Sequence, residues 1–327
     1  MKILFIGGTG NISTDCAALL QSRGHEIQIL TRGRTAVPPG YRPIRADRKD
    51  SAGMRTALAD ARPDVVLNFL GYELSDVECD FELFKGSIQQ YIFISSATVY
   101  VKPAPKLPVT EETPLGNQWW DYAQKKQACE EWLLERCRKD RFPVTIVRPS
   151  HTYSKLWVAN PVSSASYTFA LRIEQGKPVF VPDDGQILWT LTATSDFAVG
   201  FAGLVGNQKA IGEAFHITSD EALTWNQIYA EIAMAVGAKS PKIVQVPTDT
   251  ICAAAPSLIG NLKGDKSHHG VFDNAKIKGF VPEFQCRKPF RDGVREAVQW
   301  LRAHPEQQNL NPEVDALIEK VISSHPS

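Results

Sequence analysis

Short apolar runs alternate with helical patterns through the first 150 residues. Five runs of four or five residues are rich in β-branched and aromatic side chains, which predicts buried strands. Between them apolar residues recur three or four positions apart, most clearly over Asn11–Arg23 and Tyr122–Arg138, which predicts helices. This alternation is typical of an α/β, doubly wound parallel sheet covered on both faces. The predicted strands are Ile3–Ile6, Ile27–Leu30, Val65–Phe69, Tyr91–Ser95 and Val144–Val147.

The pattern changes beyond Pro149, where Ser, Pro and Gly residues that favour turns become frequent. Ala214–Ile217 predicts one more buried strand, Thr224 is expected to cap a helix that runs to Val236, and Ile243–Val246 predicts a short strand. We therefore expect a smaller, mixed α/β lobe beside the first domain. The predicted ranges are 1–150 with about 195–218 for the first domain, about 151–194 and 219–303 for the smaller lobe, and 304–327 for a C-terminal helical appendage with a helix over Pro312–Ile322.

Charge and cysteine usage narrow the class of protein. The 327 residues include 36 basic and 36 acidic ones, so no net positive field would attract nucleic acid. The six cysteines are irregularly spaced without a Cys-x-x-Cys pair, and His268 and His269 have no identifiable third and fourth ligand, so no metal site is predicted. The sequence shows neither an export signal nor a stretch long enough to span a membrane. We expect a cytoplasmic protein without a nucleic-acid or membrane partner.

A glycine-rich turn joins the first predicted strand to the first predicted helix. Gly7-Gly8-Thr9-Gly10 lets backbone amides approach a pyrophosphate at a helix N-terminus, as in the NAD(P)-binding Rossmann fold. A glycine turn without a ligand is the alternative, which the position at the first strand disfavours. Ser13 occupies the position of a third glycine, so the helix must pack with a hydroxymethyl group there. The predicted cofactor contacts in this turn are Gly7, Thr9, Gly10, Asn11 and Ile12.

The end of the second predicted strand indicates which dinucleotide is bound. Thr31–Arg34 has no acidic residue to bind both ribose hydroxyls of NAD, whereas the guanidinium groups of Arg32 and Arg34 suit the 2′-phosphate of NADP. We favour NADP, with NAD as the alternative; solvated surface arginines are the competing interpretation. Asp47 is a candidate hydrogen-bond acceptor for the adenine amino group. Further predicted cofactor contacts are Arg48, Leu70 and Gly71.

Tyr122 and Lys126 are spaced for proton transfer. Residues four apart on a helix project from the same face, so the ammonium of Lys126 can lie near the phenol of Tyr122. A hydroxyl group at the end of a nearby strand, within Ser95–Tyr100, could fix a substrate. An ordinary packing pair on an amphipathic helix is the alternative.

The order and spacing of these motifs resemble the extended short-chain dehydrogenases/reductases of the NAD-dependent epimerase/dehydratase family. The resemblance rests on Gly7-x-x-Gly10, Ser95–Tyr100, Tyr122-x-x-x-Lys126, Arg148-Pro149, Gly176-x-Pro178 and Asp273-x-x-Lys276. It implies that Tyr122 is the general base, and that Lys126 lowers the pKa of the phenol and binds the nicotinamide ribose. It also implies that Ser96 holds the substrate oxygen, with Thr98 as the alternative. A homodimer formed through the Tyr122 helix is implied as well.

Two departures from the family pattern bear on the substrate. Ala97 and Thr98 stand where 4,6-dehydratases of the family resemble one another in having Asp-Glu, so dehydration is disfavoured. Trp189 stands where sugar-nucleotide epimerases usually have a diphosphate-binding Arg, and His151 where an Asn is typical. His151 and Trp189 are the predicted substrate contacts, with a core-edge histidine and a packing tryptophan as alternatives. The residues considered as replacements for the lost charge are Lys155, Arg172 and Lys263.

The motifs together predict an enzyme that acts on a sugar or related small molecule. An NAD(P)-dependent sugar epimerase, which transfers hydride at a carbinol carbon, is the first expectation. An NADP-dependent dehydrogenase or reductase of a polyol or carbonyl compound without a nucleotide is the second. A third is a non-catalytic RNA-binding or cofactor-sensing protein, because Arg32-Gly33 and Asp47–Asp50 resemble the chloroplast stem-loop-binding branch of the family.

Overall fold

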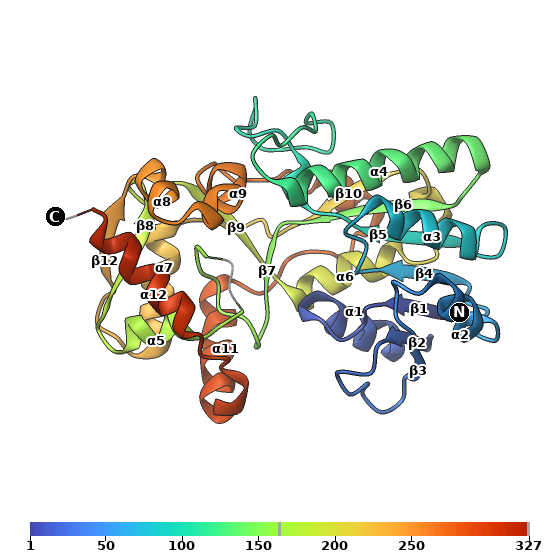
Figure 1. Ribbon diagram of the computed structural model, residues 1–327, viewed down its shortest axis with the longest axis horizontal. Helices are drawn as coiled ribbons and strands as arrows, with labels where there is room; N and C mark the ends of the chain where they lie inside the picture. The colour runs from blue at the N-terminus through green and yellow to red at the C-terminus, as the bar shows by residue number, and fades with distance from the viewer. Residues whose placement is uncertain (163–164, 326–327) are drawn as a thin grey trace.

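A seven-stranded parallel sheet forms the larger lobe of the computed structural model, which describes residues 1–162 and 165–325 (Figure 1). The strand order is β10-β6-β5-β4-β1-β2-β3, so β1 is an inner strand that pairs with β2 on one side and with β4 on the other. The chain builds the sheet outward from β1 in both directions, through connections that cross from one parallel strand to the next. This is the doubly wound arrangement that the sequence predicts. The strands are β1 (Lys2–Ile6), β2 (Glu26–Thr31), β3 (Arg42–Arg45), β4 (Val65–Asn68), β5 (Gln90–Ile94), β6 (Val144–Pro149) and β10 (Ala214–Ile217).

Helices cover both faces of this sheet because successive strand residues point to opposite sides. On β1, Ile3 and Phe5 pack with α1 (Asn11–Ser22) and α6 (Thr194–Leu204). Leu4 and Ile6 face the opposite core, which is formed with α2 (Ser51–Leu58), α3 (Leu74–Phe84) and α4 (Asp121–Asp140). All four strand residues are fully buried, so both faces of β1 are apolar, as expected for a central parallel strand.

The five strands predicted for the first domain are present, with ends shifted by one or two residues. The helix expected to end at Arg138 continues to Asp140. The edge strand β3 was not predicted, because three of its four residues are exposed and it lacks a continuous apolar run. A strand at the edge of the sheet is partly exposed, so β3 lacks the continuous apolar run by which the inner strands were predicted.

The smaller lobe surrounds an aromatic-rich core on the left of Figure 1. Thr224 and Gln227 form a capping box that starts α7 (Trp225–Val236), and Trp225 and Tyr229 on that helix are fully buried. A parallel pair joins β8 (Pro178–Pro182) to β12 (Lys242–Val246). The other elements are β7 (His151–Tyr153), β9 (Leu188–Ala193), β11 (Ala222–Thr224), α5 (Thr168–Glu174), α8 (Thr248–Ala254), α9 (Ile259–Asn261), α11 (Phe290–Ala303) and α12 (Pro312–Ser323).

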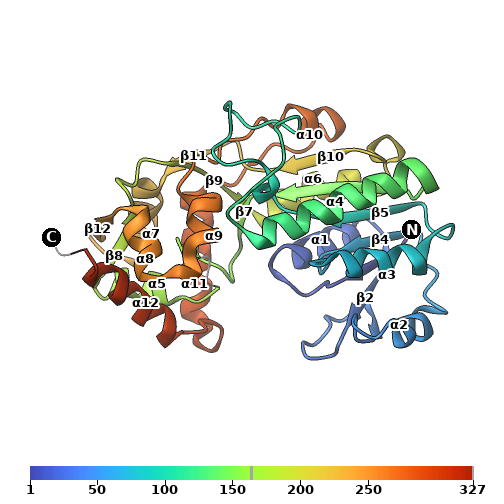
Figure 2. The same ribbon diagram turned by 45° about the horizontal axis from the view of Figure 1, so that its top comes forward.

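Packing departs from the predicted domain ranges at two places. The short helix α10 (Ala275–Phe280) lies within the range 219–303 predicted for the smaller lobe, yet Ile277 on this helix, with Val281 and Phe284 just after it, packs into the core of the larger lobe beside α6 (Figure 2). The terminal helix α12 is not a separate appendage, because its buried residues Ile318 and Val321 belong to the core of the smaller lobe. Long-range packing decides both placements.

None of the helices found in residues 1–162 and 165–325 is both long enough and apolar enough to cross a membrane.

Candidate functional site

Two adjoining cavities lie along the junction between the lobes. The larger, of about 720 Å³, follows the carboxyl ends of strands β1, β2, β4 and β5. The smaller, of about 260 Å³, lies between the larger lobe and the elements around β9. The residues common to both walls are Ser96, Tyr122, Pro149, Ser150 and His151. Predicted reacting groups therefore occupy the boundary between the two spaces.

The glycine turn forms one end of the larger cavity. Gly7 has a φ of +86°, and a Cβ atom added there would lie 2.5 Å from Cγ of Leu70. Gly10 is the N-cap of α1, and its amide donates to the buried hydroxyl of Ser13 at 2.9 Å. Ser13 thus fits at the position of the third glycine by hydrogen bonding to the turn. Thr9, Asn11 and Ile12, the other predicted cofactor contacts in this turn, also line the cavity.

Arg32 and Arg34 line the far end of the larger cavity and are exposed. In the described chain neither guanidinium group has an ion pair with a carboxylate, so both can meet an anion. Asp47 lines the same region, where its Oδ1 accepts a hydrogen bond from the backbone amide of Lys49 at 2.9 Å. This charge pattern suits a phosphate at the ribose end of a dinucleotide.

Arg48 is held inside the protein by acidic partners. Its Nη2 lies 3.0 Å from Asp80, and its Nε lies 3.4 Å from Asp76. The buried Asp80 also accepts hydrogen bonds from Tyr91 at 2.5 Å and Asn68 at 2.7 Å. Arg48 therefore contributes to the cavity wall, although its guanidinium group is engaged by protein carboxylates. The sequence did not indicate this network.

Lys126 is a buried residue in the wall of the larger cavity. Its Nζ donates to the carbonyl oxygens of Gly71 and Ile94 at 2.6 and 2.7 Å. Gly71 does not itself line the cavity, because it lies against Phe93, 2.7 Å from the position of an added Cβ. Burial lowers the pKa of Lys126 to about 8. The ammonium is 5.8 Å from the ring centroid of Tyr122, as the four-residue spacing on α4 predicts.

The phenol of Tyr122 is not shifted in the expected direction. Burial raises its pKa to about 12, and a hydrogen bond with Ser96 offsets only part of that rise. The pKa of the phenol is therefore raised and not lowered as expected from Lys126, because burial disfavours the charged phenolate. Ser96 also accepts hydrogen bonds from the Thr98 amide at 3.2 Å and the Thr98 hydroxyl at 2.9 Å. Thr98 thus orients Ser96 and lines the smaller cavity.

His151 and Trp189, the predicted substrate contacts, both line the smaller cavity. Their rings are 5.8 Å apart. Nε2 of His151 is buried and has no hydrogen-bond partner among the described residues. Burial lowers the His151 pKa to about 3, so the ring is neutral at pH 7. Trp189 is 3% exposed and its ring packs against that of Trp225 at a tilt of 33°, so it belongs to the core of the lobe as well as to the cavity wall.

Sequence reasoning missed a charged cluster in the smaller cavity. Lys102 and Lys266 are 5% and 1% exposed, and both lie near Asp265. The Nζ–carboxylate distances are 3.5 Å from Lys102 and 3.7 Å from Lys266. A five-residue π-helical turn, Leu262–Lys266, places Lys266 there. Neither lysine belongs to a motif, and only the fold brings residues 102 and 266 together.

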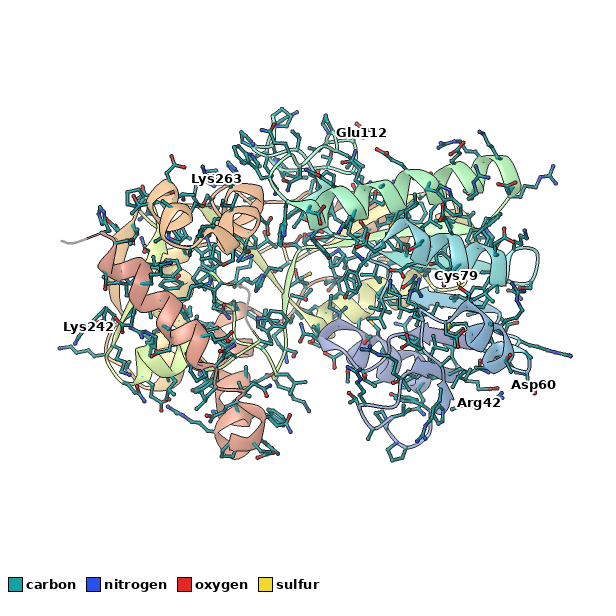
Figure 3. The ribbon with its side chains drawn as sticks, in the orientation of Figure 1. Arg42, Asp60, Cys79, Glu112, Lys242 and Lys263 are labelled. Atoms are coloured by element: carbon teal, nitrogen blue, oxygen red, sulfur yellow. The ribbon has the colours of Figure 1, made fainter. Side chains whose placement is uncertain are left out.

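The three residues considered as replacements for a missing arginine lie elsewhere. Arg172 forms ion pairs at 2.6 Å with Asp315 and Glu319. Lys263 pairs with Asp249 at 2.6 Å on the upper side of the smaller lobe in Figure 3. The third, Lys155, lies over the ring of Trp300. None of the three lines the smaller cavity.

The parallel sheet, the glycine turn and the grouping of Ser96, Tyr122 and Lys126 are features of the short-chain dehydrogenase/reductase class of protein. The model of the NAD dependent epimerase/dehydratase family matches residues 3–83 and 81–217, and the chain belongs to that family. NAD(P) binding is typical of this family.

Two curated relatives and one solved structure illustrate the range of similar proteins. The chloroplast stem-loop binding protein of 41 kDa b from Arabidopsis thaliana is 30% identical over 258 residues, which span 74% of this chain and 65% of the relative. The 2'-dehydrokanamycin reductase of Streptomyces kanamyceticus is 25% identical over 92% of this chain and 84% of its own length. The UDP-glucose 4-epimerase of Bifidobacterium longum, solved with NAD+ and UDP, shares the fold with a TM-score of 0.75 at 18% identity, over 94% of this chain and 100% of that one.

Proposed function

We propose that this protein is an NADP-dependent reductase that interconverts a carbonyl group and a secondary alcohol on a compact, polyol-like substrate. The observation that carries the proposal is the position of Ser96 and Tyr122 in the wall shared by both cavities. A cofactor in the larger cavity and a substrate in the smaller one would meet at these hydroxyl groups. The relative that matches 92% of the chain is itself named as a reductase, which agrees with this direction.

The larger cavity has the features that a dinucleotide requires. Gly7 and Gly10 expose the start of α1, and Asn11 has a buried Oδ1 without a partner in the described chain. Arg32 and Arg34 favour the 2′-phosphate of NADP over the hydroxyl of NAD. When bound, NADP supplies or accepts the hydride through its nicotinamide ring. The protein itself supplies orientation and the proton.

Tyr122 is suited to be the proton donor in reduction. With a pKa of about 12 the phenol keeps its proton at neutral pH, so it can transfer that proton to the oxygen of a carbonyl group as hydride arrives at carbon. Ser96 is placed to donate a hydrogen bond to the same oxygen. Lys126, held by two backbone carbonyl groups, places positive charge beneath the phenolate that is left.

The smaller cavity restricts the substrate. Its volume of about 260 Å³ is below the range of roughly 300–1,000 Å³ that is usual for drug-sized ligands. It has Trp189 in place of an arginine that would bind a diphosphate. These features favour a sugar-sized molecule without a nucleotide. The neutral His151 offers a polar ring nitrogen for a substrate hydroxyl group.

The experiment is to measure oxidation of NADPH by the purified protein with a panel of aldoses, ketoses and keto sugars. Turnover by the wild-type protein and its loss in Tyr122→Phe would support the proposal. Oxidation that persists in Tyr122→Phe would contradict the assigned proton donor. Turnover that uses NADH as well as NADPH would contradict the role of Arg32 and Arg34.

Sugar epimerisation is a second candidate, favoured by the match to the epimerase/dehydratase family over residues 3–217. An epimerase returns the hydride to the opposite face of the same carbon, so the cofactor remains bound and is not consumed. Conversion of a sugar to its epimer with no net change in nicotinamide absorbance would identify this reaction. Stoichiometric release of oxidised cofactor would identify the reductase.

The similarity to a stem-loop binding protein favours a third, non-catalytic candidate. The equal numbers of acidic and basic residues oppose it, as does the assembly of Ser96, Tyr122 and Lys126 at the cavity boundary. A gel-shift titration with a stem-loop RNA tests it directly. Tight RNA binding together with an absence of turnover would replace the enzyme assignment.

A further inference from the structure

The charges in the smaller cavity do not balance. Lys102, Asp265 and Lys266 are the charged residues that line it, so two cations face one carboxylate. The side chains of Lys102 and Lys266 are each only 2% exposed, and the side chain of Asp265 is 13% exposed. Because a buried charge without a partner is costly, an excess positive charge in such a cavity favours an anion as ligand.

The ammonium of Lys266 is fixed at the cavity wall by its surroundings. Its Nζ donates to Oδ1 of Asn261 and lies 5.2 Å from the ring centroid of Trp189. The backbone carbonyl of Lys266 accepts a hydrogen bond from Trp225 at 3.1 Å, which anchors the π-helical turn. Burial lowers the pKa of Lys266, and the neighbouring Lys102 lowers it further. An anion bound there would favour the protonated lysine.

We propose that Lys102 and Lys266 bind an anionic group of the substrate, a carboxylate or a phosphate, in the smaller cavity. Ser96 and Tyr122 line the same cavity, so an anionic group held by the lysines would leave the rest of a sugar-sized molecule beside the reacting hydroxyl groups. The inference rests on the proposed function only in naming the bound molecule as the substrate. The substrate class becomes a sugar acid, a related hydroxy or keto acid, or a sugar phosphate.

Calorimetric titration of the NADP-saturated protein with acetate and, separately, with inorganic phosphate tests this site without requiring turnover. We expect saturable binding of at least one ion, and the ion that binds more tightly identifies the carboxylate or the phosphate as the natural group. Lys266→Met and Lys102→Met should each weaken that binding about tenfold or more. Asp265→Asn should tighten it, because the substitution removes the negative charge that opposes the ligand.

Lys263→Met is the matched control. Lys263 lies in the same π-helical turn as Lys266, but its ammonium pairs with Asp249 outside the cavity. Its removal should therefore leave ion binding unchanged. Circular dichroism of each variant checks folding, and Lys102→Met tests the site from a different part of the chain if Lys266→Met is unstable. Absence of saturable binding, or equal affinity in the wild-type protein and both cavity variants, would overturn the proposal and leave a purely structural cluster. Failure of hydride transfer would not affect this result, because ion binding is measured directly and the Lys266 variant isolates the smaller cavity.

Discussion

The two cavities differ in how the chain brings their lining residues together. The larger is lined by short segments at the ends of successive parallel strands, and its arginines Arg32 and Arg34 are exposed to solvent. The smaller is lined by residues far apart in the chain, and its lysines Lys102 and Lys266 are buried. Because a low local dielectric strengthens electrostatic interactions, a single charge change should matter more in the smaller cavity.

The cavity proposed to bind the cofactor does not define the substrate. The larger cavity has the glycine turn common to dinucleotide-binding proteins, whereas the smaller has a cluster of Lys102, Asp265 and Lys266 that belongs to no motif. Tyr122 lies between the two and has a pKa that reflects its burial at this boundary. Experiments that change one cavity at a time can therefore separate cofactor binding from substrate binding.

The largest expected effect is at the boundary itself. Tyr122→Phe removes the proton donor while keeping the ring, so turnover should fall by about 10²–10⁴-fold with NADP affinity little changed. Steady-state kinetics and cofactor titration measure the two quantities. Tyr41→Phe is the control, because Tyr41 lies outside both cavities. Equal loss of activity in both variants would contradict a specific role for Tyr122.

The next effect concerns the pH dependence of stability. Lys126 has a pKa of about 8 when folded, against 10.5 as its ordinary value, so the unfolded chain binds more protons between these pH values. The free energy of unfolding should therefore gain about 3 kcal/mol from this residue as the pH rises from about 8 to 10.5. Chemical denaturation of Lys126→Met should lack this gain, and Lys125→Met, which removes the exposed neighbour, should retain it. If the free energy of unfolding varied with pH in the same way in both variants, the pKa of Lys126 would not be lowered by folding.

A smaller effect is expected where the chain closes the larger cavity. Gly7→Ala forces a positive φ on alanine and places its Cβ against Leu70, so we expect a loss of about 1–3 kcal/mol of stability and weaker NADP binding. Gly24→Ala is the matched control, because Gly24 has a φ of +83° but no atom within 4 Å of the added Cβ. Thermal unfolding and cofactor titration of both variants separate backbone strain from the close contact. Equal behaviour of the two variants would remove the close approach at Gly7 as a constraint.

The smallest effect should discriminate between the two cofactors. Removing Arg32 and Arg34 together by alanine substitution should weaken NADP binding about tenfold, or about 1.4 kcal/mol, and leave NAD binding nearly unchanged. Fluorescence titration with NADPH and NADH measures the ratio. Arg42→Ala, at an exposed position on the edge strand β3 (Figure 3), is the control. A parallel loss of affinity for both cofactors would show that the arginines do not read the 2′-phosphate.

Much of the fold could be predicted because its signals are local. The apolar runs on β1 and β2 and the 3.6-residue period of α1 and α4 each lie within one short segment. The polar edge strand β3 lacks such a run and was missed. The placement of α12 in the smaller lobe was also missed, because a helical period gives the face of a helix but not the surface against which it packs.

The sequence by itself determined the parallel sheet, the glycine turn at Gly7 and the pairing of Tyr122 with Lys126, because each depends on residues near one another in the chain. Only the tertiary structure decided that Arg48 is neutralised by Asp80, that burial raises the pKa of Tyr122, and that Lys102 and Lys266 share a cavity. Burial and the distance between charges depend on contacts between residues far apart in the chain, 32 residues for Arg48 with Asp80 and more than a hundred for Lys102 with Lys266. Those contacts determine the electrostatics of the site, and they cannot be predicted from the spacing of residues within one segment of the sequence.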